Sequence, residues 1–192
     1  MSESIRTPLT SSSKAFALFV FAVLLLGSTR VAAENREGAF TLSPFAGGQG
    51  FPFGGESHYD ADFDWGVRAG YNFSSRLGAE LIFGTNKTVH DPEAQRCDIN
   101  QYGADVLYFF RPDKKLMPFL AAGLGVLDVN FHGTYDGTHS LSDETNPYLN
   151  VGVGLEYGVT SWLGLRADFR EAVMLNSGDQ AMQGVLGFRL QL

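Results

Sequence analysis

The 192-residue sequence has little of several features that define common protein classes. It holds a single cysteine, Cys97, so no disulfide can form within the chain. It has no excess of basic residues, because 14 lysines and arginines stand against 21 acidic residues, and this excludes the basic face that nucleic acid requires. It also has no apolar run of about 20 residues, the length that a membrane-spanning helix needs.

The longest apolar run, Ala15 to Leu26, has instead the length and the setting of a secretory signal. Basic residues precede it, and small residues follow it up to Ala33, before a charged stretch begins. We expect cleavage after Ala33, so that residues 1–33 are a signal peptide and residues 34–192 form one domain. Cys97 is predicted to be an incidental thiol in a polar connection, since an unpaired cysteine cannot stabilise an exported fold.

From Phe63 to Phe73 apolar and polar residues alternate without interruption, and the same pattern returns from Leu149 to Val159. Side chains of a β-strand point alternately to its two faces, so each stretch predicts a strand between two different environments. Each run has about 11 residues, and a tilted strand needs roughly 9 to 11 residues to cross a bilayer. The pattern therefore predicts location as well as secondary structure.

The remaining sequence is divided into similar segments, and no linker separates a second domain. Eight strands are predicted, over residues 39–47, 62–73, 77–86, 99–110, 117–127, 148–159, 162–173 and 181–192. Pro44 predicts an edge or a bulge in the first strand, because proline removes a ladder donor. Connections after the second, fourth and sixth strands are short, and those after the first, third, fifth and seventh are longer and more polar. Outer-membrane barrels combine this asymmetry with an even number of strands.

Alternation by itself does not decide whether the polar face lines a membrane barrel or covers a soluble ligand-binding barrel. The charges on this face favour the membrane barrel, because they are nearly balanced and include arginine but no lysine, and arginine suits confined ion pairs. Glycine recurs on the same face, where a narrow lumen needs small residues beside long ones. The charged residues predicted to face the lumen are Arg68, Glu80, Asp105, Glu156, Arg166, Asp168, Arg170 and Arg189, together with Asp64.

The apolar face carries aromatic residues near the predicted strand ends, where outer-membrane barrels place girdles at the two membrane interfaces. The core of an ordinary β-sandwich also holds aromatic residues. The aromatic pattern therefore favours a membrane barrel only in combination with the predicted signal peptide. The residues predicted to lie at the lipid interfaces are Trp65, Tyr71, Phe73, Tyr108, Phe110, Tyr157, Trp162 and Phe188.

Two stretches carry a resemblance to a known family. Val106 to Gly125, two apolar segments joined by a short turn, and the final segment from Gly187 to Leu192 look like the outer-membrane β-barrel domain related to the transmembrane part of outer membrane protein A. The resemblance implies an all-β fold, an eight-stranded antiparallel up-and-down transmembrane β-barrel, in the outer membrane of a Gram-negative-type cell. The chain departs from the full-length relative in lacking a peptidoglycan-binding domain, and Leu192 stands where such barrels usually present an aromatic residue to the assembly machinery.

The expected function is structural or surface-interacting. Eight strands enclose an interior that side chains can fill, so a general porin is not expected. We expect Glu80, Asp105 or Glu156 to pair with Arg68 or Arg166, because an uncompensated buried charge costs about 3–5 kcal/mol. The resemblance implies that such pairs can gate small ions, although a structural role is the main expectation.

The predicted loops hold residues for two other kinds of function. A lipid A-modifying enzyme would use histidine, serine and acidic residues at the external rim, but no pair here has a spacing that aims both members at one point. Those candidates are His58, His90, His132, Asp136, His139, Ser140 and Glu144. Acidic candidates for a divalent ion, none spaced as in an EF-hand, are Glu56, Asp60, Asp62, Asp64, Asp136, Asp143 and Glu144. No catalytic residue, metal site or cofactor is therefore predicted.

The expected partners follow from the location. They are outer-membrane lipids, lipopolysaccharide and the barrel assembly machinery, and the acidic rim would share the cations that bridge lipopolysaccharide. The protein is expected to be a monomer that binds no nucleic acid. A soluble periplasmic ligand-binding barrel is the contrasting interpretation of the same alternation.

Overall fold

The strands account for most of the residues that the structure describes. The structure is a computed structural model that describes residues 34–192 apart from 54–57, 60–61, 92–94 and 133–143, and it leaves out the side chains of 51–53, 58–59, 88–91, 95–97 and 131–132. The strands are β1 (Phe40–Phe53), β2 (His58–Tyr59), β3 (Asp62–Asn72), β4 (Leu77–Asp91), β5 (Gln95–Phe109), β6 (Leu116–His132), β7 (Glu144–Gly158), β8 (Leu163–Met174) and β9 (Gln180–Gln191).

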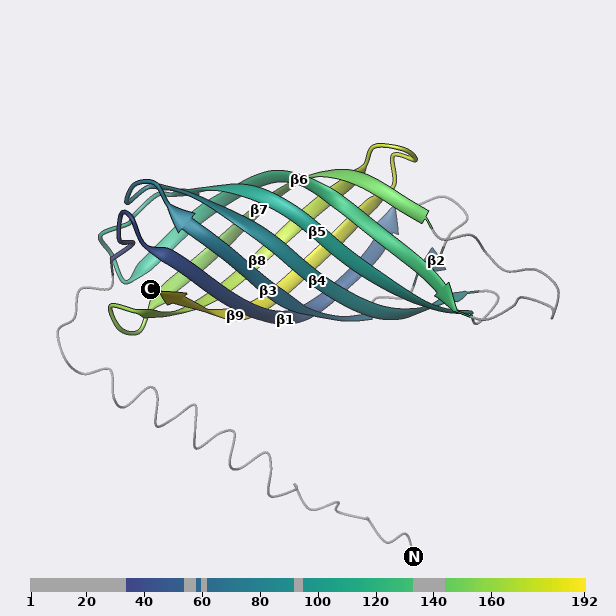
Figure 1. The fold of residues 1–192 in the computed structure, drawn as a ribbon, viewed down its shortest axis with the longest axis horizontal. Helices are drawn as coiled ribbons and strands as arrows, with labels where there is room; N and C mark the ends of the chain where they lie inside the picture. Colours follow the sequence, from purple (N-terminus) through teal and green to yellow (C-terminus); the bar gives the residue numbers. More distant parts are fainter. Residues whose placement is uncertain (1–33, 54–57, 60–61, 92–94, 133–143) are drawn as a thin grey trace, which may run out of the picture. The chain divides into compact units, whose positions relative to one another are not determined.

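Eight of these strands close into an antiparallel barrel (Figure 1). From β3 to β9 each strand pairs with the next along the chain, and β1 closes the ring by pairing with both β3 and β9. The two residues of β2 form only a short ladder with the end of β4. The predicted fold class, an eight-stranded up-and-down antiparallel barrel, is confirmed.

The pairing register sets the tilt of the strands. Following paired residues once round the barrel from Phe40 leads back to β1 at Gly50, ten residues further along. With about 3.3 Å per residue and about 4.8 Å between strands, this stagger gives a tilt of about 40°. A run of about 11 residues at this tilt rises roughly 28 Å, which covers an apolar band of about 25 Å.

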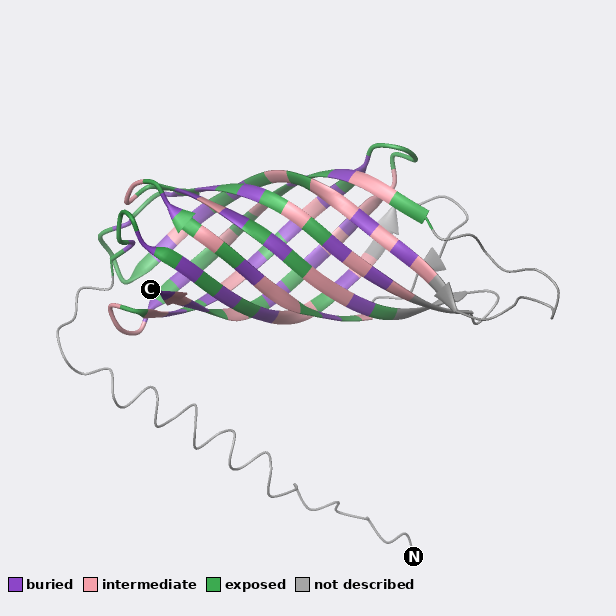
Figure 2. Ribbon diagram, in the orientation of Figure 1, coloured by how far each residue is buried: buried purple, intermediate pink, exposed green. Residues whose placement is uncertain are grey.

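Around the middle of the barrel apolar side chains face outward and polar ones inward. Exposed and buried residues alternate along every long strand, as the bands in Figure 2 show. Leu124, Val151 and Leu186 are each more than 60% exposed, whereas Arg68 and Glu156 are about 1% exposed. This arrangement is the reverse of a soluble ligand-binding barrel, so that alternative is wrong.

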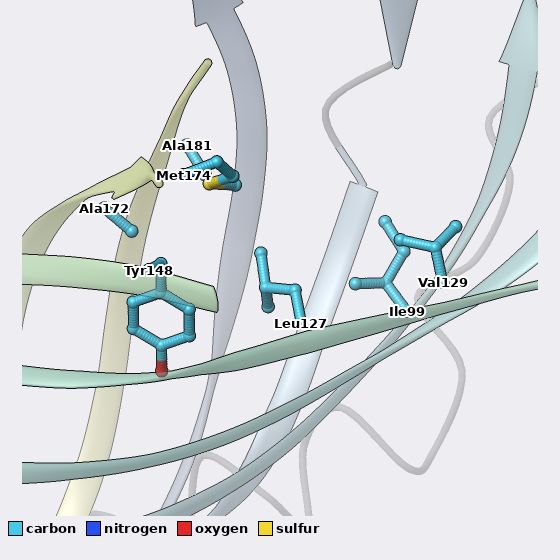
Figure 3. Packing of buried hydrophobic residues seen from close by; sticks show 7 residues of the cluster. All are labelled: Ile99, Leu127, Val129, Tyr148, Ala172, Met174 and Ala181. Atoms are coloured by element: carbon cyan, nitrogen blue, oxygen red, sulfur yellow. The ribbon is translucent and has the colours of Figure 1, made fainter. Parts of the chain in front are cut away.

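Beyond this apolar band the pattern inverts at the end opposite the short turns. The side chains that face outward there are polar, including Lys87, Asn100 and Asp128. Seven of those that face inward form a buried cluster contributed by five strands (Figure 3). We call this the apolar cap; its members are Ile99, Leu127, Val129, Tyr148, Ala172, Met174 and Ala181. The external part of the barrel therefore has the polarity of a water-soluble barrel.

This inversion explains why several predicted boundaries are wrong. The segments predicted to end at Asn86 and to begin at Ile99 continue as paired strands to Asp91 and from Gln95, so the backbone of Cys97 lies in β5 and not in a loop. Only three residues separate β4 from β5, and five separate β8 from β9, so these two connections are not long as predicted. The strands extend beyond the apolar exterior, since hydrogen bonding between their backbones does not require an apolar outer face.

Pro44 is accommodated without a bulge. The β1–β3 register is regular through this residue, and the β1–β9 ladder has no pair at Ser43 or Pro44. The register shift in β1 lies further along, between Gly50 and Phe53. The missing ladder donor was predicted correctly, but it leaves a local gap and not an edge.

The two ends of the described chain meet at the end of the barrel with the short turns (Figure 1). The Arg36 guanidinium donates a hydrogen bond of 2.8 Å to the Gln191 carbonyl, and the Gln191 side chain donates one of 3.3 Å to the Glu34 carbonyl. In outer-membrane barrels this end faces the periplasm. A search of the described residues found no helix with the length and apolarity needed to cross a membrane.

Candidate functional site in the barrel lumen

Six charged side chains meet at the centre of the lumen. Three of them, Arg166, Asp168 and Arg170, stand at every second position of β8 and therefore share its inner face. The other three reach them from β3, β4 and β5, across the barrel. We call this group the central network; its members are Arg68, Glu80, Asp105, Arg166, Asp168 and Arg170.

Two bidentate pairs form the core of the central network. Arg166 donates to both carboxylate oxygens of Glu80, at 2.8 and 3.0 Å, and Arg68 donates to both oxygens of Asp168, at 2.8 and 3.1 Å. Two parallel bonds of this kind fix orientation as well as charge. The pairs join β4 and β3 to β8.

Arg170 links these pairs to a third carboxylate. Its guanidinium lies 2.6 Å from Glu80 Oε1 and 3.0 Å from Asp168 Oδ1, and it also donates to Asp105. The Asn150 amide donates to the other oxygen of Asp105 at 3.0 Å. Every member of the central network therefore has at least one oppositely charged partner, and three positive charges balance three negative ones.

A second cluster closes the lumen at the end with the short turns. Arg189 donates to Glu156 at 2.6 Å, to Asn72 at 2.6 Å and to Asn35 at 3.0 Å. Asn72 in turn donates to the side chain of Asn35 and to the Arg36 carbonyl, both at 2.9 Å. This cluster attaches the segment that precedes β1 to the interior of the barrel.

Aromatic rings and glycines complete the interior. The guanidinium carbons of Arg68, Arg166 and Arg189 lie 4.2 to 4.8 Å from the ring centres of Phe45, Phe119 and Phe109 respectively, within cation–π range. Glycine provides the space for these groups. A Cβ at Gly123 would lie 2.1 Å from Asp105 Oδ1, and one at Gly154 would lie 2.2 Å from the Phe119 ring.

The structure places all nine charged residues predicted for the lumen inside the barrel, each 8% exposed or less. The expected contact between Glu80 and Arg166 is present, but Asp105 pairs with Arg170, and Glu156 pairs with Arg189. The neutral members were not singled out from the sequence, although they share the inward-facing positions that could have identified them. They include Asn35, Asn72, Gln101, Tyr148, Asn150 and Gln183.

The eight aromatic residues predicted for the lipid interfaces lie on the outside, each at least 36% exposed. Seven of them lie within three residues of a strand end on the short-turn side. Their rings are in contact along this rim: the ring centres of Tyr71 and Phe73 lie 5.3 Å apart, and those of Tyr108 and Phe110 lie 5.2 Å apart. Trp65 is the exception, because it lies near the opposite end of β3, three residues after Asp62, and pairs with Thr85.

The predicted rim candidates fall largely outside the described residues. The backbones of His58, His90 and His132 lie in strands, but their side chains are not described. Glu144 begins β7 and is exposed, and Asp62 and Asp64 are at the start of β3, where Asp64 points inward. Those outside the described residues altogether are Glu56, Asp60, Asp136, His139, Ser140 and Asp143. Within the part of the chain that is described, no three His, Cys, Asp or Glu residues are grouped to hold a metal ion.

Three solved structures illustrate the fold that this chain shares. Neisserial surface protein A is similar over 81% of this chain and 100% of its own, with a TM-score of 0.65 and 20% identity. The N-terminal barrel of Pseudomonas aeruginosa OprF covers 81% and 98% with a TM-score of 0.57 and 19% identity. Ail, the attachment invasion locus protein of Yersinia pestis, covers 82% and 100% with a TM-score of 0.53 and 14% identity.

A search of curated proteins found no sequence that matches this chain. A family profile, by contrast, does match. The profile described as "Outer membrane protein beta-barrel domain" matches residues 19–190, nearly the whole chain. The protein therefore belongs to the outer membrane protein beta-barrel domain family, and it resides in the outer membrane of a Gram-negative-type cell.

Proposed function

We propose that the protein is a structural barrel of the outer membrane whose lumen is closed to solutes and whose acidic loops meet the cell's surroundings. The observation that carries the proposal is the central network, which joins β8 to three strands on the other side of the lumen. An arginine whose guanidinium is hydrogen-bonded to two buried carboxylates cannot move aside without leaving those charges unpaired. A solute crossing the barrel would have to break these pairs.

The lumen is also filled at both ends. The cluster around Arg189 lies below the central network, and the apolar cap lies above it. An apolar constriction disfavours water and therefore ions. These three layers in series support a barrel that stabilises the envelope and presents loops, in preference to one that conducts.

Solute flux tests this proposal. The purified barrel reconstituted in liposomes should exclude a small sugar such as arabinose, so that swelling rates match those of empty liposomes. A general porin reconstituted in parallel serves as the positive control. Swelling at the porin rate would show that the three layers are not closed in the membrane.

We further propose that lipopolysaccharide and outer-membrane lipids are its principal contacts, that the assembly machinery inserts it, and that it is a monomer. The exposed apolar belt supports lipid contact, and the outward-facing carboxylate of Asp128 is one of the acidic groups that divalent cations would bridge to lipopolysaccharide. Cross-linking in whole cells should therefore yield a band of monomer size, and a stable dimer band would contradict the monomer.

A non-enzymatic role is part of the proposal. Lipid A mass spectra from cells with and without the protein should be identical. A new mass difference, such as a lost acyl chain, would instead support lipid A modification by residues of the external rim.

A further inference from the structure

One carboxylate in the lumen forms none of the ion pairs found among the described residues. The described part of the lumen holds five acidic side chains and four arginines, and four of the five acids form the ion pairs described above. The fifth, Asp64, is 1% exposed and faces inward from β3. Arg68 lies on the same strand, but its bonds go to Asp168 and its remaining nitrogen faces Glu80 at 3.8 Å.

The hydrogen bonds of Asp64 come from neutral groups. The Gln183 amide donates to Asp64 Oδ2 at 2.5 Å and to Gln101 Oε1 at 3.0 Å, and the Trp65 backbone N–H also donates to Asp64. These bonds orient the carboxylate and leave its charge in place. Arg68 attracts this charge from a distance, but its hydrogen bonds go to Asp168. A buried charge without a counter-charge in contact is far more costly than a buried neutral group.

Unused oxygen atoms gather beside this carboxylate. Asn86 is the register partner of Asp64 on β4, is 2% exposed, and has no hydrogen-bond partner for either amide atom. Side chains at paired positions on one face have Cβ atoms about 5 Å apart. The amide oxygen of Gln183 is likewise buried and unpartnered. Three oxygen-bearing side chains from β3, β4 and β9 therefore face one region of the lumen.

Gly84 provides room next to these oxygens. A Cβ built on Gly84 would lie 3.5 Å from Asp64 Oδ1, 3.3 Å from Gln101 Oε1 and 3.4 Å from the Phe45 ring. A side chain at this position would therefore occupy a space that two oxygen atoms and one aromatic ring border. Oxygen atoms arranged around such a space, with a net charge of minus one, are the donor set of a hard cation.

We propose that a monovalent cation, sodium or potassium, binds in the upper lumen between Asp64, Asn86 and Gln183. The charge balance selects a monovalent ion, because one positive charge neutralises the single unpaired carboxylate, whereas a divalent ion would leave an excess of positive charge. A water molecule would satisfy the two amides but not the charge. The site adjoins both layers of the lumen, because Asn86 pairs with Ile99 of the apolar cap and Gln183 pairs with Arg170 of the central network, so the ion enters as the barrel folds.

Rubidium serves as a probe because it is a monovalent cation with a strong anomalous signal. The barrel is refolded in detergent with rubidium chloride and crystallised, and the anomalous difference map is computed. The expected result is a peak bordered by the side-chain oxygens of Asp64, Asn86 and Gln183. A map without a peak there would overturn the proposal and leave a proton or a water molecule as the occupant.

Thermal unfolding provides the second readout. Tm should be about 3 °C higher for barrels refolded in sodium chloride than in N-methyl-D-glucamine chloride of equal ionic strength, since the large organic cation does not fit. Asp64→Asn keeps an acceptor for Gln183 but removes the charge, and the Tm difference between the two salts should vanish. A Tm difference that persists in Asp64→Asn would show that sodium acts elsewhere.

Gly84→Ala keeps the test decisive if Asp64→Asn does not fold. This variant retains the carboxylate and fills the space beside it, so it should lose both the rubidium peak and the Tm difference. Gly184→Ala is the matched control, because its added methyl group would meet only the Phe169 ring, at 3.9 Å, and should leave both signals unchanged. Equal rubidium peaks in the two variants would contradict the assigned position.

Discussion

Replacing Arg166 with alanine is the sharpest test of the central network. The change removes two bonds to Glu80, at 2.8 and 3.0 Å, and one to Asp168 at 3.0 Å, together with the contact over the Phe119 ring. Glu80 and Asp168 would keep Arg170, but the network would carry three carboxylates against two arginines. Removing one partner of a buried ion pair costs about 3–5 kcal/mol, so we expect a loss of this size in the free energy of unfolding.

The loss can be measured by urea titration of the barrel refolded into lipid vesicles. Trp65 and Trp162 report unfolding through fluorescence, and the folded band on an unboiled gel gives an independent measure. Arg76→Ala is the matched control, because Arg76 is exposed in the turn between β3 and β4, and such surface changes usually stay within about 0.5 kcal/mol. If Arg166→Ala lost no more stability than Arg76→Ala, the network would not hold the barrel together.

Three further outcomes are expected. Leu124→Arg should destabilise the barrel by about 2–4 kcal/mol in vesicle titrations, because Leu124 lies in the apolar band. Asn100→Arg, beyond this band, should cost about 0–1 kcal/mol. Equal losses would refute the placement of Leu124 inside the membrane and of Asn100 outside it. Gly123→Ala should fail to give a folded gel band, because its Cβ would lie 2.2 Å from the Ala104 carbonyl oxygen; a normal band would mean that the strands can separate. In a Cys97→Ser background, Asn100→Cys should react with a membrane-impermeant maleimide on intact cells and Leu124→Cys should not, so the reverse order would invert the assigned polarity.

Much of the fold was predictable because the strands of a membrane barrel alternate between residues that face lipid and residues that face the lumen. The run from Phe63 to Phe73 alternates because its odd positions meet lipid and its even positions meet the lumen, and β3 runs from Asp62 to Asn72 as predicted within one residue. The parts of β4 and β5 that extend above the membrane were not predicted from the sequence. Their outward-facing side chains are polar, so the alternation of apolar and polar residues that identified the other strands is absent there.

The lumen residues were predictable as a set, but their partners were not. Parity along each strand identifies which side chains point inward, and it separates Arg68 and Arg166, which face the lumen, from Lys87, which faces outward. Pairing depends on the stagger between strands that lie on opposite sides of the barrel. Glu80 therefore meets Arg166, while Glu156 meets Arg189, and no local spacing in the sequence distinguishes these choices.

The sequence by itself determined that this chain forms a barrel with a polar interior, because side-chain alternation and the choice of arginine over lysine are properties of single strands. Only the tertiary structure decided which charges neutralise one another and which one does not. Closure of the ring with a ten-residue stagger brings β8 opposite β3, β4 and β5, and leaves Asp64 beside neutral amides. That decision is geometric, since an ion pair needs atoms about 3 Å apart, and such contacts across a lumen exist only once all eight strands have closed.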